Sequence, residues 1–142
     1  MHILYFHQHF STPRGATGIR SYEMARRLLY HGHSVTMVCG SYGSGVTGLD
    51  GPFLDGVRRG SVDGINVIEF DLSYSNHDGF VKRSATFWKY AWGSLQVALK
   101  EEYDILFATT TPLTAGLPGI AARWLRRKPF VFEVRDLWPE LP

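Results

Sequence analysis

Short apolar runs alternate with longer amphipathic segments along most of this chain, and this alternation restricts its possible folds more than any other feature. The apolar runs lie at residues 3–6, 34–39, 65–72, 104–109 and 129–134. Apolar residues recur at spacings of three and four, as in amphipathic helices, in residues 18–30, 80–101 and 113–127. Strands that alternate with helices predict an α/β fold with a mostly parallel sheet.

The order of the predicted strands follows from the handedness of their connections. Right-handed crossovers predict a Rossmann-like, doubly wound sheet whose strands, numbered along the chain, lie in the order 3-2-1-4-5. The loops at residues 7–17, at 109–112 and from 135 onward then meet at the carboxyl edge, where open α/β sheets bind ligands. The glycine-rich residues 40–64 show no sustained period and are predicted to be a mobile surface excursion.

Composition narrows the classes of function. The 142 residues suffice for one domain with a real core. No stretch approaches the ~20 apolar residues that cross a bilayer, and residues 1–6 lack the basic start and long apolar run of a signal peptide. The lone Cys39 excludes an intramolecular disulfide and is typical of a reducing cytoplasm. The net charge of +2 is too small to indicate binding to nucleic acid.

The first crevice loop combines small residues with cations. Thr17 and Gly18 would let a ligand approach the backbone, and the next helix would offer free N–H groups to a phosphate. Arg14 and Arg20 could add charge-assisted hydrogen bonds. The loop has neither the dinucleotide-binding glycine pattern nor a Walker sequence. A turn that only caps the helix is the alternative interpretation.

The other two loops supply hydroxyl and charged groups. Thr110 could bond a sugar or a phosphate, although it could equally cap the next helix. Arg135 suits a phosphate or a developing negative charge, and Asp136 could accept from a hydroxyl or orient Arg135. A purely local ion pair between these two residues is the alternative. Glu140 follows them, and His7 stands near the crevice mouth as a candidate for proton transfer. The six histidines do not form a metal set, so no metal is expected.

The helix predicted at residues 80–101 mixes aromatic and basic side chains. Such a mixture suits a membrane interface. The candidate membrane contacts are Lys82, Arg83, Phe87, Trp88, Lys89 and Trp92. An ordinary core-facing helix explains the apolar spacing equally well, so both interpretations stand.

Three segments together resemble a known family. Residues 1–10 resemble its first strand, residues 17–36 its glycine loop, first helix and Gly-His-x-Val-Thr turn, and residues 135–140 its Asp-Leu-Trp-Pro-Glu element. The chain is similar to the N-terminal domain of a two-domain (GT-B) retaining glycosyltransferase of family 4. The third element is typical of bacterial members that build surface polysaccharides.

The resemblance implies a hexosyltransferase-like enzyme that moves a sugar from a nucleotide-sugar to a glycan or lipid-linked hydroxyl acceptor. It implies no metal and no cofactor beyond the donor substrate. Residues 1–142 would be the acceptor-side domain, with the nucleotide-sugar-binding C-terminal domain absent and the fragment alone inactive. By the same resemblance, Gly18 and Arg20 belong near the donor phosphate and the acceptor, whereas Arg135 and Asp136 face the transferred sugar. Lipid-linked acceptors would place the cytoplasmic protein peripherally on the inner membrane face.

Two departures from the family pattern matter. Thr17 stands where many members have the first glycine, and Arg135 stands where many have a histidine. Two other functions remain open. A nucleotide-sugar epimerase on the same scaffold would need acids and bases, for which only His7, Asp136 and Glu140 are available. A non-enzymatic module would bind a membrane or a partner through the aromatic-basic helix.

Overall fold

A single twisted sheet forms the centre of the computed structural model, which describes residues 1–74, 77–110 and 113–135. Within these ranges the strand order is β3-β4-β2-β1-β5-β6. The strands are β1 (His2–Phe6), β2 (Ser34–Tyr42), β3 (Val57–Val62), β4 (Ile65–Tyr74), β5 (Ile105–Thr109) and β6 (Phe130–Glu133). All neighbouring pairs are parallel except β3 with β4, which is antiparallel. The five parallel strands lie in the predicted order, so the doubly wound fold class is confirmed.

The edge strand β3 corrects the prediction of an unstructured excursion over residues 40–64. Strand β2 continues to Tyr42, and β3 pairs with β4 from Val57 to Val62. Strands β3 and β4 are joined at Asp63 and Gly64, which both have positive φ (50° and 85°). An Asp-Gly pair in this conformation makes the tight turn favoured in β-hairpins. The Asp63-Gly64 dipeptide was therefore a usable sequence signal for a hairpin, although the many other glycines in residues 40–64 made it hard to distinguish.

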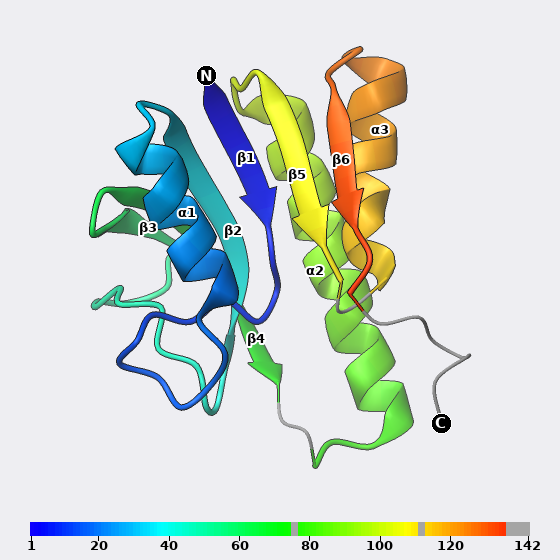
Figure 1. Cartoon of the computed structure of the whole chain (residues 1–142). Helices are drawn as coiled ribbons and strands as arrows, with labels where there is room; N and C mark the ends of the chain where they lie inside the picture. The colour runs from blue at the N-terminus through cyan, green and yellow to red at the C-terminus, as the bar shows by residue number, and fades with distance from the viewer. Residues whose placement is uncertain (75–76, 111–112, 136–142) are drawn as a thin grey trace.

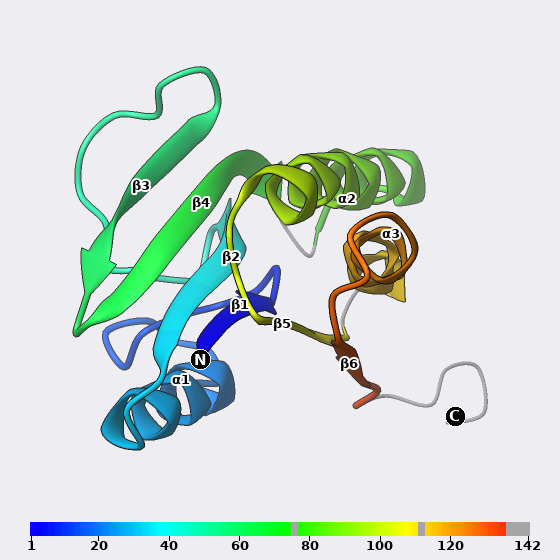
Figure 2. The same ribbon diagram turned by 90° about the horizontal axis from the view of Figure 1, so that it is seen from above.

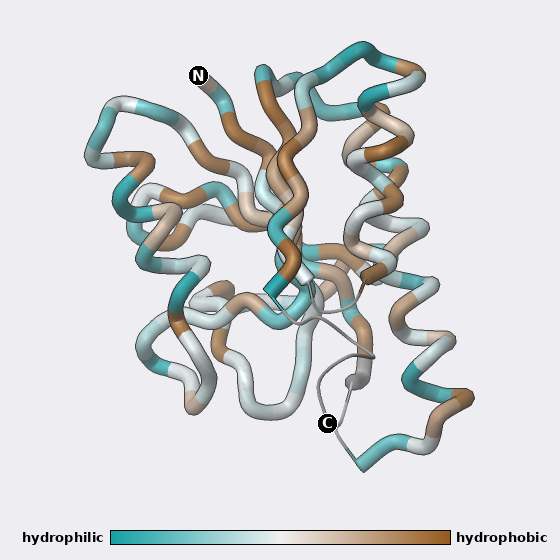
Figure 3. Tube along the Cα trace, turned by 45° about the vertical axis from the view of Figure 1, so that its right-hand side comes forward, coloured by the Kyte–Doolittle hydropathy of each residue, from teal (hydrophilic) through white to brown (hydrophobic). Residues whose placement is uncertain are grey.

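Helices cover both faces of the sheet. Helix α1 (Arg20–Tyr30) lies on one face, while α2 (Phe80–Lys100) and α3 (Leu117–Leu125) lie side by side on the other (Figures 1 and 2). Because side chains alternate along a strand, Leu4 and Phe6 pack in the cluster under α2, whereas Tyr5 packs under α1. Figure 3 shows how hydrophobic residues concentrate along the central strands.

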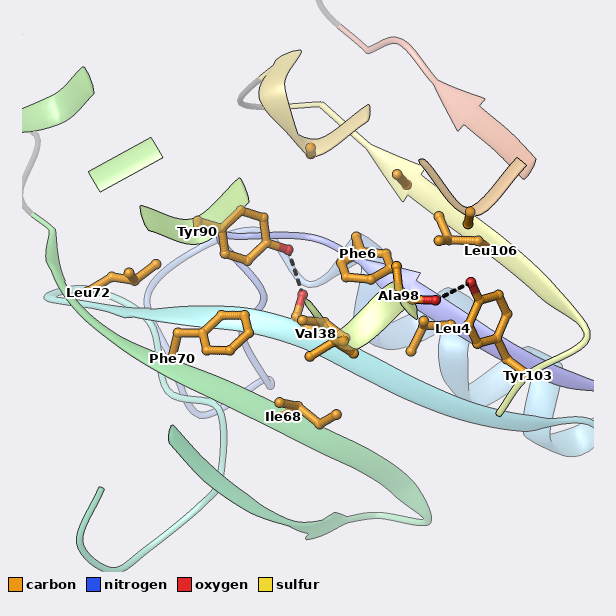
Figure 4. Packing of buried hydrophobic residues seen from close by; sticks show 14 residues of the cluster. Leu4, Phe6, Val38, Ile68, Phe70, Leu72, Tyr90, Ala98, Tyr103 and Leu106 are labelled. Atoms are coloured by element: carbon orange, nitrogen blue, oxygen red, sulfur yellow. Dashed lines mark hydrogen bonds between the residues drawn. The ribbon is translucent and has the colours of Figure 1, made fainter. Parts of the chain in front are cut away.

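A buried tyrosine joins α2 to the middle of the sheet. The Tyr90 hydroxyl donates to the carbonyl oxygen of Val38 at 2.8 Å, and its ring packs edge-on against Phe70 (Figure 4). Tyr90 is fully buried, so this bond gives its hydroxyl a partner inside the core. The hydrogen bond from Tyr90 to Val38 therefore helps to fix the position of α2 along the direction of β2.

The helix predicted at residues 113–127 is divided in the structure. A 3-10 turn, η1 (Leu113–Gly116), precedes α3. Pro118 sits in the first turn of α3, where a missing N–H does no harm. A Cβ on Gly119 would come within 2.0 Å of the Phe130 ring. Glycine at this position therefore lets α3 pack closely on β6.

A largely buried ion pair attaches β3 to the rest of the sheet. Glu69 is 2% exposed and accepts from Arg58 Nε at 2.7 Å and from Arg58 Nη2 at 3.1 Å. The Thr47 hydroxyl also donates to Glu69 at 2.7 Å. The hydrogen bond from Arg58 to Glu69 raises the pKa of the Arg58 guanidinium. Among the described residues, every hydrogen-bond partner of this carboxylate is a donor, as a buried charge requires.

We predict that Arg58→Ala destabilises the chain by about 3 kcal/mol, because the buried Glu69 carboxylate loses its cation. Chemical denaturation monitored by circular dichroism measures the change. Arg59→Ala is the matched control on the same strand, since Arg59 pairs with Glu101 at an exposed position, and it should cost no more than about 1 kcal/mol. Equal losses in the two variants would contradict the structural role of the Arg58 pair.

Candidate functional site

Charged and hydroxyl side chains meet where β1, β5 and β6 end. The guanidinium of Arg20, in the first turn of α1, pairs with Glu133 Oε1 at the end of β6. The hydroxyl of Thr109, at the end of β5, donates to Glu133 Oε2 at 2.7 Å. The loops after the three strands therefore meet at one edge, as the predicted strand order requires. We call His7, Arg20, Thr109, Thr110, Glu133 and Arg135 the strand-end cluster.

Thr110 holds the start of the third crevice loop. Its backbone N–H donates to the carbonyl oxygen of Glu133 at 3.1 Å, and its hydroxyl accepts from the backbone N–H of Arg135 at 2.9 Å. Thr110 is buried, while Arg135 is exposed. The hydroxyl of Thr110 thus fixes the backbone from which the Arg135 side chain reaches into solvent.

His7 is the buried member of the strand-end cluster. It follows β1, and its Nδ1 lies 2.7 Å from the Ser21 hydroxyl of α1. Burial lowers the pKa of His7 to about 3, with further lowering by His9, Arg135 and Arg20. His7 is therefore an uncharged imidazole at neutral pH, able to donate from one ring nitrogen and accept at the other.

The neighbouring Tyr5 responds to the charges of the same cluster. Its pKa is raised by burial and by the negative charge of Glu133, while Arg20 and Arg135 act in the opposite direction. The pKa of His7 is likewise affected by Arg20 and Arg135. Arg20, Arg135 and Glu133 are therefore close enough to the carboxyl end of β1 to influence the pKa of a side chain there.

The first crevice loop leaves the start of α1 open. A Cβ built on Gly18 would meet no atom within 4 Å. Ile19 occupies the N-cap and makes no side-chain cap hydrogen bond. Thr17 is engaged elsewhere, since its hydroxyl lies 2.6 Å from the Tyr42 hydroxyl, which donates to the carbonyl oxygen of His9. The helix N-terminus beside Arg20 is therefore suited to an anion.

Arg14 makes its contacts away from the strand-end cluster. Its guanidinium lies 3.5 Å from the position that a Cβ on Gly48 would take. Together with Tyr42 and Arg58 it lines an open hollow over the segment after β2. The structure thus brings together Arg20, His7, Thr110 and Arg135, but places Arg14 in a different surrounding.

The candidate membrane contacts on α2 divide into exposed rings and engaged cations. Trp88 and Trp92 are 62% and 65% exposed. Lys82 pairs with Asp78, and Lys89 donates to the carbonyl oxygen of Asp71. Arg83 is exposed, and Phe87 is half-buried. In the described part of the chain, no helix is both long and apolar enough to span a bilayer.

Helix α3 carries an exposed apolar stripe that sequence reasoning missed. Leu117, Ile120 and Trp124 recur at helical spacing and are exposed, opposite the buried Pro118 and Ala122. A shallow hollow beside Trp124 is also lined by two basic residues, Arg123 and Arg127. The outer faces of both helices on this side of the sheet therefore combine aromatic and basic side chains.

Two residues of the strand-end region were not predicted: Ser21 and Glu133. The available signal for Glu133 was a lone carboxylate at the end of an otherwise apolar strand. Asp136 and Glu140 lie outside the described residues. Within the described ranges, no three His, Cys, Asp or Glu side chains gather closely enough to hold a metal ion.

Comparison with protein families assigns the chain. The family model described as "Glycosyl transferase 4-like domain" matches residues 15–142. The chain belongs to this family. The match covers the strand-end cluster except His7. No curated protein sequence matches this glycosyltransferase-like domain significantly.

Solved structures share the fold of this domain. The catalytic domain of starch synthase IV from Arabidopsis thaliana, bound to ADP and acarbose, superposes with a TM-score of 0.67 at 14% identity. The match covers 95% of this chain and 34% of the starch synthase chain, so this chain spans about a third of the catalytic domain that it matches. The C-terminal domain of a hydrogenase from Pyrococcus furiosus gives a TM-score of 0.60 at 15% identity, covering 93% of this chain and 90% of that one. At such identities the likeness shows the Rossmann-like fold alone.

We predict that His7 makes the domain acid-sensitive. Its folded-state pKa lies below the ordinary value of 6.5, so the unfolded chain binds the extra proton first. The contribution of this residue to stability is therefore intact above pH 6.5 and falls by up to about 1.4 kcal/mol per pH unit as the pH drops toward 3.

Denaturation curves at several pH values test this dependence. His7→Asn should flatten it between pH 6.5 and 4, whereas His31→Asn, at an exposed site, should leave it unchanged. A histidine whose ring titrates near pH 6.5 in an NMR measurement, assigned to His7, would refute the prediction.

Proposed function

We propose that this domain is the acceptor-side half of a retaining glycosyltransferase. The full protein would move a sugar from a nucleotide-sugar donor to a glycan or lipid-linked hydroxyl acceptor. One observation carries the proposal: a glycosyltransferase 4-like domain has two arginines, Arg20 and Arg135, at the carboxyl edge of its sheet. Arginine is suited to the phosphate oxygens on which charge develops when a nucleotide leaves.

The chain's own groups would divide the work at that edge. Arg20 and the open N-terminus of α1 at Gly18 would hold the donor phosphates. Arg135 would face the transferred sugar, with Asp136 and Glu140 as further polar groups of the same loop. His7, held neutral by burial, would offer a hydrogen bond without adding charge. No step in this scheme uses a metal.

A second domain would be needed to complete the reaction. A nucleotide-sugar bound at the carboxyl edge of this domain alone would stay hydrated and poorly aligned. We therefore propose that a C-terminal nucleotide-binding domain closes the site in the full protein. The domain by itself would bind nucleotide weakly and transfer no sugar. Assembly of a bacterial surface polysaccharide is the proposed pathway class, which rests on the Asp-Leu-Trp-Pro-Glu element at residues 136–140.

The outer face of α2 and α3 supports a second proposal, peripheral contact with the cytoplasmic face of a membrane. Trp88 and Trp92 on α2 and Trp124 on α3 are all more than half exposed. Basic residues accompany them on both helices. Aromatic rings that enter the headgroup region, with cations for anionic lipids, would bring a lipid-linked acceptor close to the domain.

We predict that Arg20→Ala or Arg135→Ala in the full protein lowers kcat/KM about 10²- to 10³-fold, because each removes a charged donor from the developing phosphate charge. Steady-state transfer assays measure the loss, and circular dichroism verifies the fold. Arg27→Ala is the control, since Arg27 lies in the last turn of α1, away from the strand ends. Full activity in both test variants would remove these residues from the site.

We predict that the domain sediments with phosphatidylglycerol-containing liposomes at low salt and is released at high salt. Trp88→Ala together with Trp92→Ala should weaken this binding about tenfold, because two aromatic anchors are lost. Tyr30→Ala is the matched control, as Tyr30 is 82% exposed but lies on α1 across the sheet. Absence of sedimentation at low salt would contradict the membrane proposal.

A further inference from the structure

Glu133 stands at the centre of the strand-end cluster. Each of its carboxylate oxygens has a different partner: Oε1 faces the Arg20 guanidinium, and Oε2 accepts from the Thr109 hydroxyl at 2.7 Å. Its own carbonyl oxygen accepts from the N–H of Thr110. Glu133 therefore connects α1, β5 and β6 through one residue.

The pairing leaves part of Arg20 available. Among the described residues, Arg20 contacts Glu133 through Nη2, and the Arg20 side chain is still 54% exposed, while the Glu133 side chain is 21% exposed. A guanidinium has five N–H donors in a rigid plane, so a carboxylate on one side can fix its orientation and leave the other side for a ligand. A free arginine samples many rotamers, and a ligand that orders it must offset that lost entropy.

We infer that Glu133 is a positioning residue that orients Arg20 toward the anion-binding edge. The Thr109 hydroxyl in turn fixes the orientation of the Glu133 carboxylate through its hydrogen bond to Oε2. The inference rests on the proposed role of Arg20 as a phosphate-binding residue. It adds that this role depends on a carboxylate that touches no substrate atom.

Charge and position have opposite effects on an anion, and this difference makes the inference testable. Removing the negative charge of Glu133 alone would strengthen anion binding nearby. Removing the support of Arg20 would weaken it. A cycle of Glu133→Ala, Arg20→Ala and the double variant separates the two, because the charge effect is present in both backgrounds whereas the positioning effect needs Arg20.

The experiment uses the 142-residue chain, isotope-labelled, with inorganic pyrophosphate as the probe. The Arg20 Nε–Hε signal is assigned by its loss in Arg20→Ala, and its heteronuclear NOE reports the order of the guanidinium. The NOE should drop to that of a freely moving arginine in Glu133→Ala. Glu133→Gln should restore most of it, because the amide oxygen can accept from Arg20 while the amide N–H donates to Thr109.

Pyrophosphate titrations of the four proteins of the cycle provide the second readout. The factor by which Glu133→Ala raises the Kd for pyrophosphate should be at least about threefold larger when Arg20 is present than when it is absent. An unchanged Arg20 NOE in Glu133→Ala would overturn the inference. So would a coupling of the opposite sign, since Glu133 would then compete with the anion. If Arg20→Ala leaves pyrophosphate affinity unchanged, the proposed phosphate role of Arg20 fails, and the NOE comparison alone decides whether Glu133 orients it.

Discussion

The pairing of β1 with two parallel neighbours is the constraint on which the rest of this domain depends. β1 bonds to β2 on one side and to β5 on the other. Right-handed crossovers join parallel strands, and the connections from β1 to β2 and from β4 to β5 run in opposite directions along the sheet, so they pass over opposite faces. Helix α1 therefore lies on one face and α2 and α3 on the other. The same arrangement makes the carboxyl end of β1 the point where loops from both halves of the sheet meet.

The charged and titratable groups at the carboxyl end of β1 differ in their exposure to solvent, and this difference determines their electrostatic properties. His7 is buried, and burial together with nearby cations keeps its ring uncharged. Arg20 and Arg135 are exposed cations. Glu133 lies between these extremes and shares its two oxygens between a cation and a hydroxyl. At neutral pH the edge thus presents two cations, one of them paired with a carboxylate, beside a neutral imidazole, and this arrangement supports the proposed binding of an anion.

The fold alone does not decide what such an edge does. A starch synthase and a domain of a hydrogenase share this arrangement of strands and helices at similar TM-scores. These are two different proteins, so the proposed function rests on the family match and on the residues of the strand-end cluster. The outer aromatic and basic face of α2 and α3 is a separate feature, on the far side of the sheet from α1.

Periodic patterns in the sequence determined the strands and helices, because spacing of two or of three to four follows from backbone geometry alone. The handedness of the crossovers then determined the strand order and the two helical layers. Tertiary structure decided the partners. The antiparallel β3 depends on pairing with β4, and the position of Arg14 depends on how the segment after β2 folds back. Above all, Arg20 and Glu133 lie 113 positions apart. Their contact exists only because β6 is placed next to β5 and α1 begins beside β1, and no local pattern records such a meeting.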